Sequence, residues 1–198
     1  DPGAAWRSPT FDDSAWASGL AQLGYGDFDE STVVSYGPDP NNKYVTTYFR
    51  HAFPVTNAFA ITNLTVRLLR DDGAAVYLNG TEIYRQNMPT GEVTYATSAL
   101  VDVPTPELSS LISIPSGSLV TGTNMFAVEV HQASGGVEGA QMAVELYFSL
   151  VPAAPETLAF NEHSASTNAE FWVELVNYGS HSMLLDGRVI YCDGAGTN

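Results

Sequence analysis

Apolar and polar residues alternate along most of the chain, and the alternating stretches end at turn residues. This period of two is typical of half-buried β-strands, whereas the 3.6-residue period of an amphipathic helix is hard to find. In one such stretch, Phe126, Val128 and Val130 share a face and leave Glu129 and His131 on the other. The sequence therefore predicts an all-β fold. Strands are predicted at 44–53, 61–69, 75–78, 82–84, 111–114, 124–131 and 141–150.

Two dipeptides inside the strand-rich part, Asp72-Gly73 and Asn79-Gly80, mark turns. Both tolerate the positive φ angles of the primed turns that join neighbouring antiparallel strands. We therefore expect a three-stranded meander over residues 61–85.

The two ends of the chain differ from this middle part. Residues 1–43 have few long apolar runs, which predicts loops and short strands that cover the core rather than build it. Two prolines with small residues between them predict a linker. The predicted organisation is a domain over 1–150, a linker over 151–156 and a short β segment over 157–198, with strands at 158–161, 171–177 and 183–191.

The C-terminal β segment is smaller than a domain that folds alone without disulfides or metal, so we expect it to need a partner surface. Another copy of the chain could complete it by strand addition at unpaired edges. A chain cut inside its second domain is the other interpretation, with these strands packed on the first domain or frayed. The start at Asp1 rather than Met also indicates a processed product or a fragment.

Charge excludes several classes of partner. The 198 residues include 22 acidic and 7 basic side chains, for a formal net charge of −15. Nucleic-acid binding needs a basic face, and an anionic membrane surface repels so acidic a chain. Because no run of about 18 apolar residues occurs, we expect no membrane insertion. Cys192 is the single cysteine, which excludes an intramolecular disulfide.

Four motifs occur in a specific order: FDDSAWASGLAQLGYGD at 11–27, TTYFRHAF at 46–53, DDGAAVYLNGTEIYR at 71–85 and GTNMFAVEVHQ at 122–132. Together they resemble the galactose-binding-like jelly-roll domains appended to secreted bacterial proteins. The resemblance implies a jelly-roll β-sandwich that is an accessory module, extracellular or at the cell surface, and not itself an enzyme.

The C-terminal segment resembles the first half of a bacterial lamin-tail domain, which has an immunoglobulin-like fold. The matching residues are Asn161-Glu162, the stretch 174–177 (ELVN) and the turn 185–187 (LDG). A complete domain of that fold needs roughly 100 residues. The segment is therefore expected to be partial.

Asp71 and Asp72 form the first candidate ligand site. Paired carboxylates at a loop tip can hold calcium through their oxygens. A similar Asp-Asp-Gly in adhesin modules of the PA14 type contributes to calcium-dependent sugar binding. Turn geometry alone is the alternative explanation, because Asp-Gly is a common turn dipeptide.

Asp27, Asp29 and Glu30 form the second candidate site, with three carboxylates within four residues. They lack the glycine and the distal glutamate of an EF-hand loop. A structural calcium ion and a solvated acidic loop are both compatible with this pattern. We expect no other cofactor.

Aromatic residues gather in the N-terminal quarter, where exposed rings could stack on sugars. Tyr25 and Tyr36 are the better candidates for exposure and ligand contact, whereas Trp16 is predicted in the core. His131 closes a strand and either lines a binding rim or is a structural residue. Asn63 and Asn79 match the glycosylation sequon. The strand arginines are expected to pair with acids, namely Arg50, Arg67, Arg70 and Arg85.

No catalytic motif stands out, because the chain has no G-x-S-x-G elbow, no H-E-x-x-H and no phosphate-binding glycine loop. We therefore expect a non-catalytic extracellular module for carbohydrate binding or surface attachment, whose partner is a polysaccharide or surface glycan. The alternative is a structural subunit of an extracellular assembly formed with other copies of the chain. A hydrolase with its catalytic half elsewhere is a third hypothesis.

Overall fold

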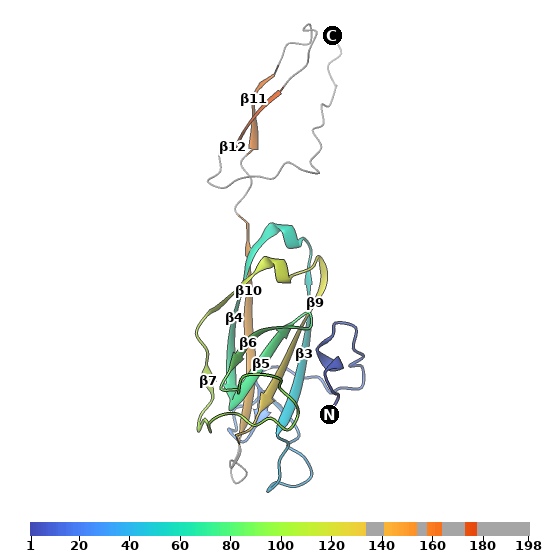
Figure 1. Cartoon of the computed structure of the whole chain (residues 1–198), viewed down its shortest axis with the longest axis vertical. Helices are drawn as coiled ribbons and strands as arrows, with labels where there is room; N and C mark the ends of the chain where they lie inside the picture. Colours follow the sequence, from blue (N-terminus) through green and yellow to red (C-terminus); the bar gives the residue numbers. More distant parts are fainter. Residues whose placement is uncertain (134–140, 154–157, 164–172, 178–198) are drawn as a thin grey trace. The chain divides into compact units, whose positions relative to one another are not determined.

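The computed structural model describes residues 1–133, 141–153, 158–163 and 173–177. Its contacts divide the chain into two units, Asp1–Pro152 and Ala153–Asn198. The first unit is a sandwich of two β-sheets (Figure 1). Its helical turns are the short 3₁₀ segments η1 (Ala5–Arg7), η2 (Ala58–Ala60) and η3 (Ser116–Ser118). The prediction of an all-β sandwich is confirmed.

The first sheet has the strand order β2-β1-β10-β4-β7, and β8 also pairs with β4. All its pairs are antiparallel except β1 with β2. Because of the register between β1, β10 and β4, the last residues of β1 and β4 lie at the same end of the first sheet, on either side of the first residues of β10. The strand bounds are β1 (Leu23–Tyr25), β2 (Thr32–Val33), β4 (Ile61–Asp71), β7 (Glu107–Leu108), β8 (Ile112–Pro115) and β10 (Met142–Pro152).

The second sheet has the order β3-β9-β5-β6 and is antiparallel throughout. Its strands are β3 (Thr46–Val55), β5 (Gly73–Leu78), β6 (Thr81–Gln86) and β9 (Gly122–His131). Strand β3 continues through Pro54, past the predicted end. An edge strand accommodates this proline because one of its sides has no ladder partner to bond.

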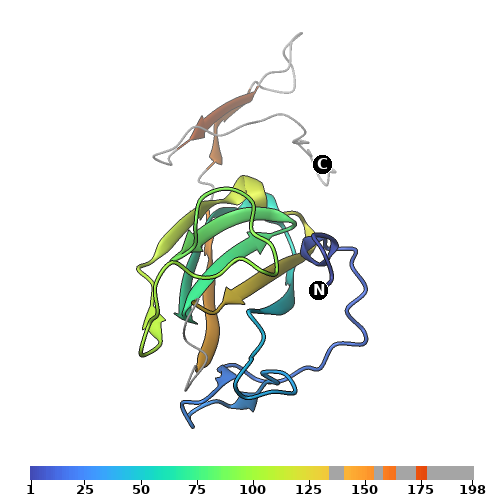
Figure 2. The ribbon, with the colours of Figure 1, turned by 60° about the horizontal axis from the view of Figure 1, so that its bottom comes forward.

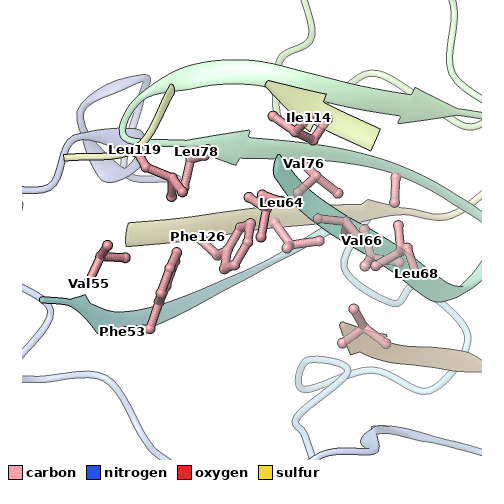
Figure 3. Packing of buried hydrophobic residues seen from close by; sticks show 14 of the residues in the cluster. Phe53, Val55, Leu64, Val66, Leu68, Val76, Leu78, Ile114, Leu119 and Phe126 are labelled. Carbon is pink, nitrogen blue, oxygen red and sulfur yellow. The ribbon is translucent and has the colours of Figure 1, made fainter. Parts of the chain in front are cut away.

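The core lies between the two sheets and follows the alternation seen in the sequence. Leu64 and Leu68 from β4 face Val76 from β5 and Phe126 from β9 (Figure 3), and all four are 0% exposed. The Phe53 ring stacks on Phe126 with a centroid distance of 4.8 Å. Inward-facing residues of both sheets therefore build one core, as the period of two requires.

The outer face of the second sheet is covered as well. Trp6 of η1 is 0% exposed and packs edge-on against Tyr77, with ring centroids 5.8 Å apart, and η1 lies against β9 (Figure 2). Glu129 and His131 do face away from the core, as predicted, yet both are buried at 1% and 0% exposure. The N-terminal segment, residues 1–13, thus covers part of the sandwich, and its Trp6 side chain is buried against the second sheet.

The predicted three-stranded meander is wrong. Strand β4 belongs to the first sheet, whereas β5 and β6 belong to the second. The chain crosses between the sheets at Asp71 and Asp72, which a cis peptide bond joins. A Cβ atom on Gly73 would lie 2.7 Å from the Asn87 oxygen, so this glycine serves a close approach rather than a turn. The β5–β6 turn is confirmed, with positive φ at Asn79 (52°) and Gly80 (87°).

The boundary region and the second unit are described in part. Strand β10 extends through Pro152, two residues into the predicted linker. Strands β11 (Leu158–His163) and β12 (Val173–Asn177) form an antiparallel pair at two of the predicted positions. The predicted strand 183–191 and Cys192 lie outside the described residues. No helix in the described ranges is long and apolar enough to cross a membrane.

Candidate functional site

A cleft of about 530 Å³ lies along the edge of the sandwich at β3. It is bounded by the loop at residues 13–21 and by strands β3, β9 and β10. This volume lies within the range of about 300–1,000 Å³ that is usual for small-molecule sites. The lining includes the aromatic residues Trp16, Tyr48, Phe49, Phe126 and Phe148 and the polar residues Asp13, Ser18, Arg50, His51 and Glu145.

Aromatic and aliphatic surfaces remain open at the mouth of this cleft. Trp16 is half-buried, packs edge-on against Phe11 at 5.7 Å and lies against the core cluster that contains Trp6 and Tyr77, so its predicted place in the core is confirmed in part. Phe148 is 37% exposed and Leu20 is 79% exposed. The exposed His51 ring lies 6.1 Å from that of Phe148. The cleft therefore offers apolar faces beside hydrogen-bonding groups.

Arg50 holds the N-terminal segment against β3 and so shapes the cleft wall. Its guanidinium donates to the backbone oxygens of Trp6, Ser8 (3.0 Å) and Phe11 (3.4 Å) and to Asp13 Oδ2 (2.7 Å). The Arg50 side chain is 2% exposed. Since its donors are engaged within the protein, Arg50 is a structural residue rather than an anion ligand.

The predicted pairing of strand arginines with acids is confirmed for three of the four. Arg50 pairs with Asp13, Arg70 with Glu107 and Arg85 with Glu82, each at 2.7 Å. Arg67 instead donates from Nε to the backbone oxygen of Ser109 at 3.1 Å.

A second group of polar residues lies in the loop that follows β1, at the end of the first sheet. One ligand atom each of Asp27, Asp29 and Glu30 lies within 4.8 Å of the others. Phe28, between them, is 98% exposed and has a positive φ of 67°. Burial, followed by the charges of Asp29 and Glu30, raises the pKa of Asp27. The loop thus brings three carboxylates together, as the sequence predicted.

Asp71 and Asp72 are not at an exposed loop tip, which corrects the prediction. They are 1% and 2% exposed, because the crossing between the sheets lies inside the packed end of the sandwich. Asp72 accepts hydrogen bonds from the backbone of Val103 (2.6 Å) and Ala133 (2.8 Å). Burial, then the adjacent Asp72 and the charge of Asp27, raises the pKa of Asp71 to about 8.

Tyr25 is buried, contrary to the predicted exposure, whereas Tyr36 is 37% exposed. The Tyr25 side chain belongs to the core because β1 lies inside the first sheet. The two rings meet edge-on at 5.5 Å, and Lys43 Nζ lies 5.0 Å from the Tyr25 centroid. These contacts place Tyr25 in a packed aromatic cluster rather than on an open sugar platform.

His131 is likewise buried rather than at a rim. Its Nδ1 lies 2.6 Å from the Thr97 carbonyl oxygen and 2.9 Å from Thr46 Oγ1. Its Nε2 lies 3.4 Å from Glu129 Oε2. His131 therefore joins β9, β3 and the loop at residue 97, which supports the structural interpretation.

The buried Glu129 completes a network that the sequence did not indicate. Its Oε1 accepts hydrogen bonds from the Tyr77 hydroxyl (2.6 Å) and from Arg7 Nη2 (3.0 Å). Burial, then the hydrogen bond to Glu129, raises the pKa of Tyr77. The sequence shows that Glu129 alternates with the core residues Val128 and Val130. Alternation alone places such a residue on the solvent face, so it does not indicate a buried network.

Both predicted sequon asparagines use their side-chain amides within the fold. Asn63 Nδ2 donates to Ser113 Oγ at 2.5 Å. Asn79 Nδ2 donates to the Ser118 oxygen (3.0 Å) and to Asn124 Oδ1 (2.8 Å). Each nitrogen thus has a structural role, and glycosylation at either position stays a prediction.

Comparison with solved structures finds a likeness to the crystal structure of a β-glucuronidase from Bacteroides uniformis. The TM-score is 0.50 at 15% identity, over 81% of this chain and 18% of that enzyme. No protein-family model matches the chain, and no curated protein matches it. The likeness concerns the β-sandwich fold, and the chain spans less than a fifth of the enzyme's length.

Proposed function

We propose that residues 1–152 form a non-catalytic carbohydrate-binding module of a larger extracellular or cell-surface protein, and that the sugar binds in the cleft beside β3. The cleft carries this proposal. Its volume of about 530 Å³ is enough for a short oligosaccharide segment, and its lining mixes aromatic with polar side chains.

The chemistry of the lining favours a sugar over a purely apolar ligand. Pyranose rings present C–H faces that pack on aromatic side chains, and Trp16 and Phe148 supply such surfaces at the mouth. Sugar hydroxyls both donate and accept, and Glu145 and His51 provide acceptors and a donor beside those rings. The lining therefore matches both the apolar C–H faces and the polar hydroxyl groups of a carbohydrate.

The motif order supports the same role from the sequence side. The resemblance to galactose-binding-like jelly-roll modules covers most of the first unit, and the lamin-tail-like segment follows it in the chain. Accessory modules of that kind attach secreted proteins to glycans or surfaces. The likeness to the β-glucuronidase supports the fold alone, so the ligand is argued from the cleft.

Binding to a panel of polysaccharides, measured by glycan array and affinity electrophoresis, tests the proposal. We expect Trp16→Ala and His51→Ala each to weaken binding by at least about tenfold, equivalent to one lost contact of about 1.4 kcal/mol. Phe59→Ala is the matched control, because Phe59 is an aromatic residue that is 96% exposed outside the cleft.

Two results would overturn the proposal. One is the absence of binding to every polysaccharide tested, and the other is wild-type affinity in both cleft variants. Release of reducing sugar from a bound polysaccharide would contradict the non-catalytic part and favour a hydrolase.

The β11–β12 pair favours the alternative function, a subunit of an extracellular assembly. Within the described part of the second unit these two strands pair with each other alone. A two-stranded sheet is marginally stable by itself, and an added strand from another copy would extend it. Size-exclusion chromatography with light scattering tests this function, because an assembly predicts an oligomer and a monomer stable over a dilution series contradicts it.

A further inference from the structure

Strand β10 has an open edge beside the cleft that β3 borders. Strand β4 pairs with β10 from Ala143 to Pro152, whereas β1 pairs on the other edge only as far as Val144. Beyond Val144, no strand among the described residues pairs with that edge. Leu146 and Phe148 belong to this stretch, and both line the cleft. The cleft therefore lies where the first sheet has no strand next to β10.

Hydrogen bonds along β10 show which way its main-chain groups point. The carbonyl oxygen of Ser149 accepts from Thr65 Oγ1 of β4 at 3.4 Å, and that of Val151 likewise accepts from a threonine of this strand, at 3.2 Å. In an antiparallel strand, the N–H and C=O groups of successive residues point alternately to the two edges. The main-chain groups of Leu146 and Phe148 therefore point to the open edge, beside the cleft that these residues line.

The pairing of β1 gives the same alternation. The Gly24 carbonyl accepts from the Val34 N–H at 2.8 Å, so the main-chain groups of Gly24 point to β2. Those of the adjacent Leu23 consequently point to β10, where Leu23 pairs with Val144. Leu146 is the next residue of β10 with the same direction as Val144. Its main-chain donor and acceptor thus continue the row that β1 satisfies as far as Val144.

The cleft has no free positive charge from lysine or arginine among the described residues. Arg50 is the one such side chain in the described lining, and it is 2% exposed. Its guanidinium is already bonded to backbone oxygens of the N-terminal segment and to Asp13. The other lysine and arginine residues of 1–152 lie outside the lining, namely Arg7, Lys43, Arg67, Arg70 and Arg85.

Two acids line the cleft instead. Asp13 forms an ion pair with Arg50 at 2.7 Å, so this pair is neutral as a unit. Glu145 is half-buried and forms no ion pair within the described part of the chain. A ligand carboxylate or sulfate would therefore lose water here without gaining a counter-charge, and Glu145 would repel it. The formal net charge of −15 acts in the same direction.

Building on the proposed sugar site, we infer that the cleft selects uncharged glycans and excludes those that carry uronate or sulfate groups. Sugar hydroxyls bond to uncharged donors and acceptors, which the main chain at Leu146 and Phe148 and the Ser18 hydroxyl supply. A buried ligand anion needs a paired charge, which this lining does not supply. The charge of a polysaccharide is therefore expected to decide whether it binds.

Affinity electrophoresis and isothermal titration calorimetry of the full chain test the inference, at about pH 8, where an ordinary histidine is neutral. Neutral galactan, mannan, xylan, β-glucan and fully methyl-esterified polygalacturonate are compared with polygalacturonate, alginate and chondroitin sulfate at low salt. The two forms of polygalacturonate share a backbone and differ in charge. We expect the best neutral polymer to have a Kd at least about tenfold lower than that of every acidic one.

The outcomes separate this inference from the proposed function on which it rests. Binding to no polymer would overturn both. A Kd for any acidic polymer within tenfold of the best neutral one would overturn the inference alone, because sugar binding would remain.

Glu145→Lys gives the cleft a positive charge and should strengthen binding of at least one acidic polymer by about tenfold. Glu92→Lys is the matched control, since it makes the same charge change at an exposed glutamate outside the cleft. No gain in Glu145→Lys, or an equal gain in both variants, would overturn the inference, because the exclusion would then not come from the charge of the lining.

Discussion

Replacing Arg50 by methionine should release the N-terminal segment from β3 and open one wall of the cleft. Methionine keeps an apolar stem of similar length in the buried position, so the change removes the guanidinium bonds rather than the packing. Those bonds reach three backbone oxygens and one carboxylate between Trp6 and Asp13. The Ser8 oxygen also accepts from the Phe11 backbone N–H at 3.1 Å, whereas among the described residues no other side chain bonds to the Trp6 and Phe11 oxygens or to the Asp13 carboxylate.

The expected loss of unfolding free energy is about 3 kcal/mol. A hydrogen bond to a charged group contributes about 1.5–3 kcal/mol, but the four bonds do not add fully, because the freed carbonyls regain water when the segment lifts. The Asp13 side chain is 41% exposed, so its ion pair with Arg50 contributes at most about 1 kcal/mol. Most of the loss should therefore come from the backbone acceptors.

Urea unfolding followed by tryptophan fluorescence measures this loss, and limited proteolysis reports release of the segment. The Tm should fall by about 6–12 °C for a chain of this size. Asp13→Asn is the control, since it weakens the exposed ion pair and leaves the backbone bonds intact. The reasoning is refuted if Arg50→Met stays within about 0.5 kcal/mol of the wild type, or loses no more than Asp13→Asn.

Three further predictions concern the core, a turn and pH. Phe126→Ala should cost about 3–5 kcal/mol in urea unfolding, because Phe126 is 0% exposed between the sheets, whereas the exposed Phe59→Ala should cost less than about 0.5 kcal/mol. Asn79→Ala should cost about 2 kcal/mol in the same assay, because it removes side-chain bonds at a residue with a φ of 52°. Asp71 should contribute a loss of stability as the pH rises from about 4 to about 8. Its pKa is raised to about 8 in the folded protein, so the unfolded chain binds fewer protons in that window. Melting curves of Asp71→Asn should therefore show a smaller decline than the wild type between pH 5 and pH 8.5, and an equal decline would contradict this assignment.

The strands were predictable because burial of one face imposes a period of two on the sequence. The inward Phe126 and the outward Glu129 occupy the faces that alternation assigns to them. Alternation does not report what covers the second face. Trp6 and Arg7 cover it here through contacts more than 70 residues away in the chain, such as Trp6 with Tyr77.

Crossings between sheets were not predictable from local turn chemistry. Asp72-Gly73 and Asn79-Gly80 look alike in the sequence, yet only the second forms a hairpin with both residues at positive φ. The difference lies in packing around Gly73, where the Asn87 backbone approaches too closely for a side chain. Tyr25 was misplaced for a related reason, because its burial depends on β1 pairing with a strand near residue 142.

Two buried carboxylates, Glu129 and Asp71, are compensated in different ways. Glu129 is 1% exposed and receives a guanidinium from Arg7 and a hydroxyl from Tyr77. Asp71 is equally buried but keeps an unpartnered oxygen, and the nearest arginine in the chain bonds elsewhere. A buried negative charge needs a compensating positive group in either place. The chain supplies that group to Glu129 from its own sequence, whereas burial and the adjacent Asp72 raise the pKa of Asp71 to about 8 and so favour its protonated form near neutral pH.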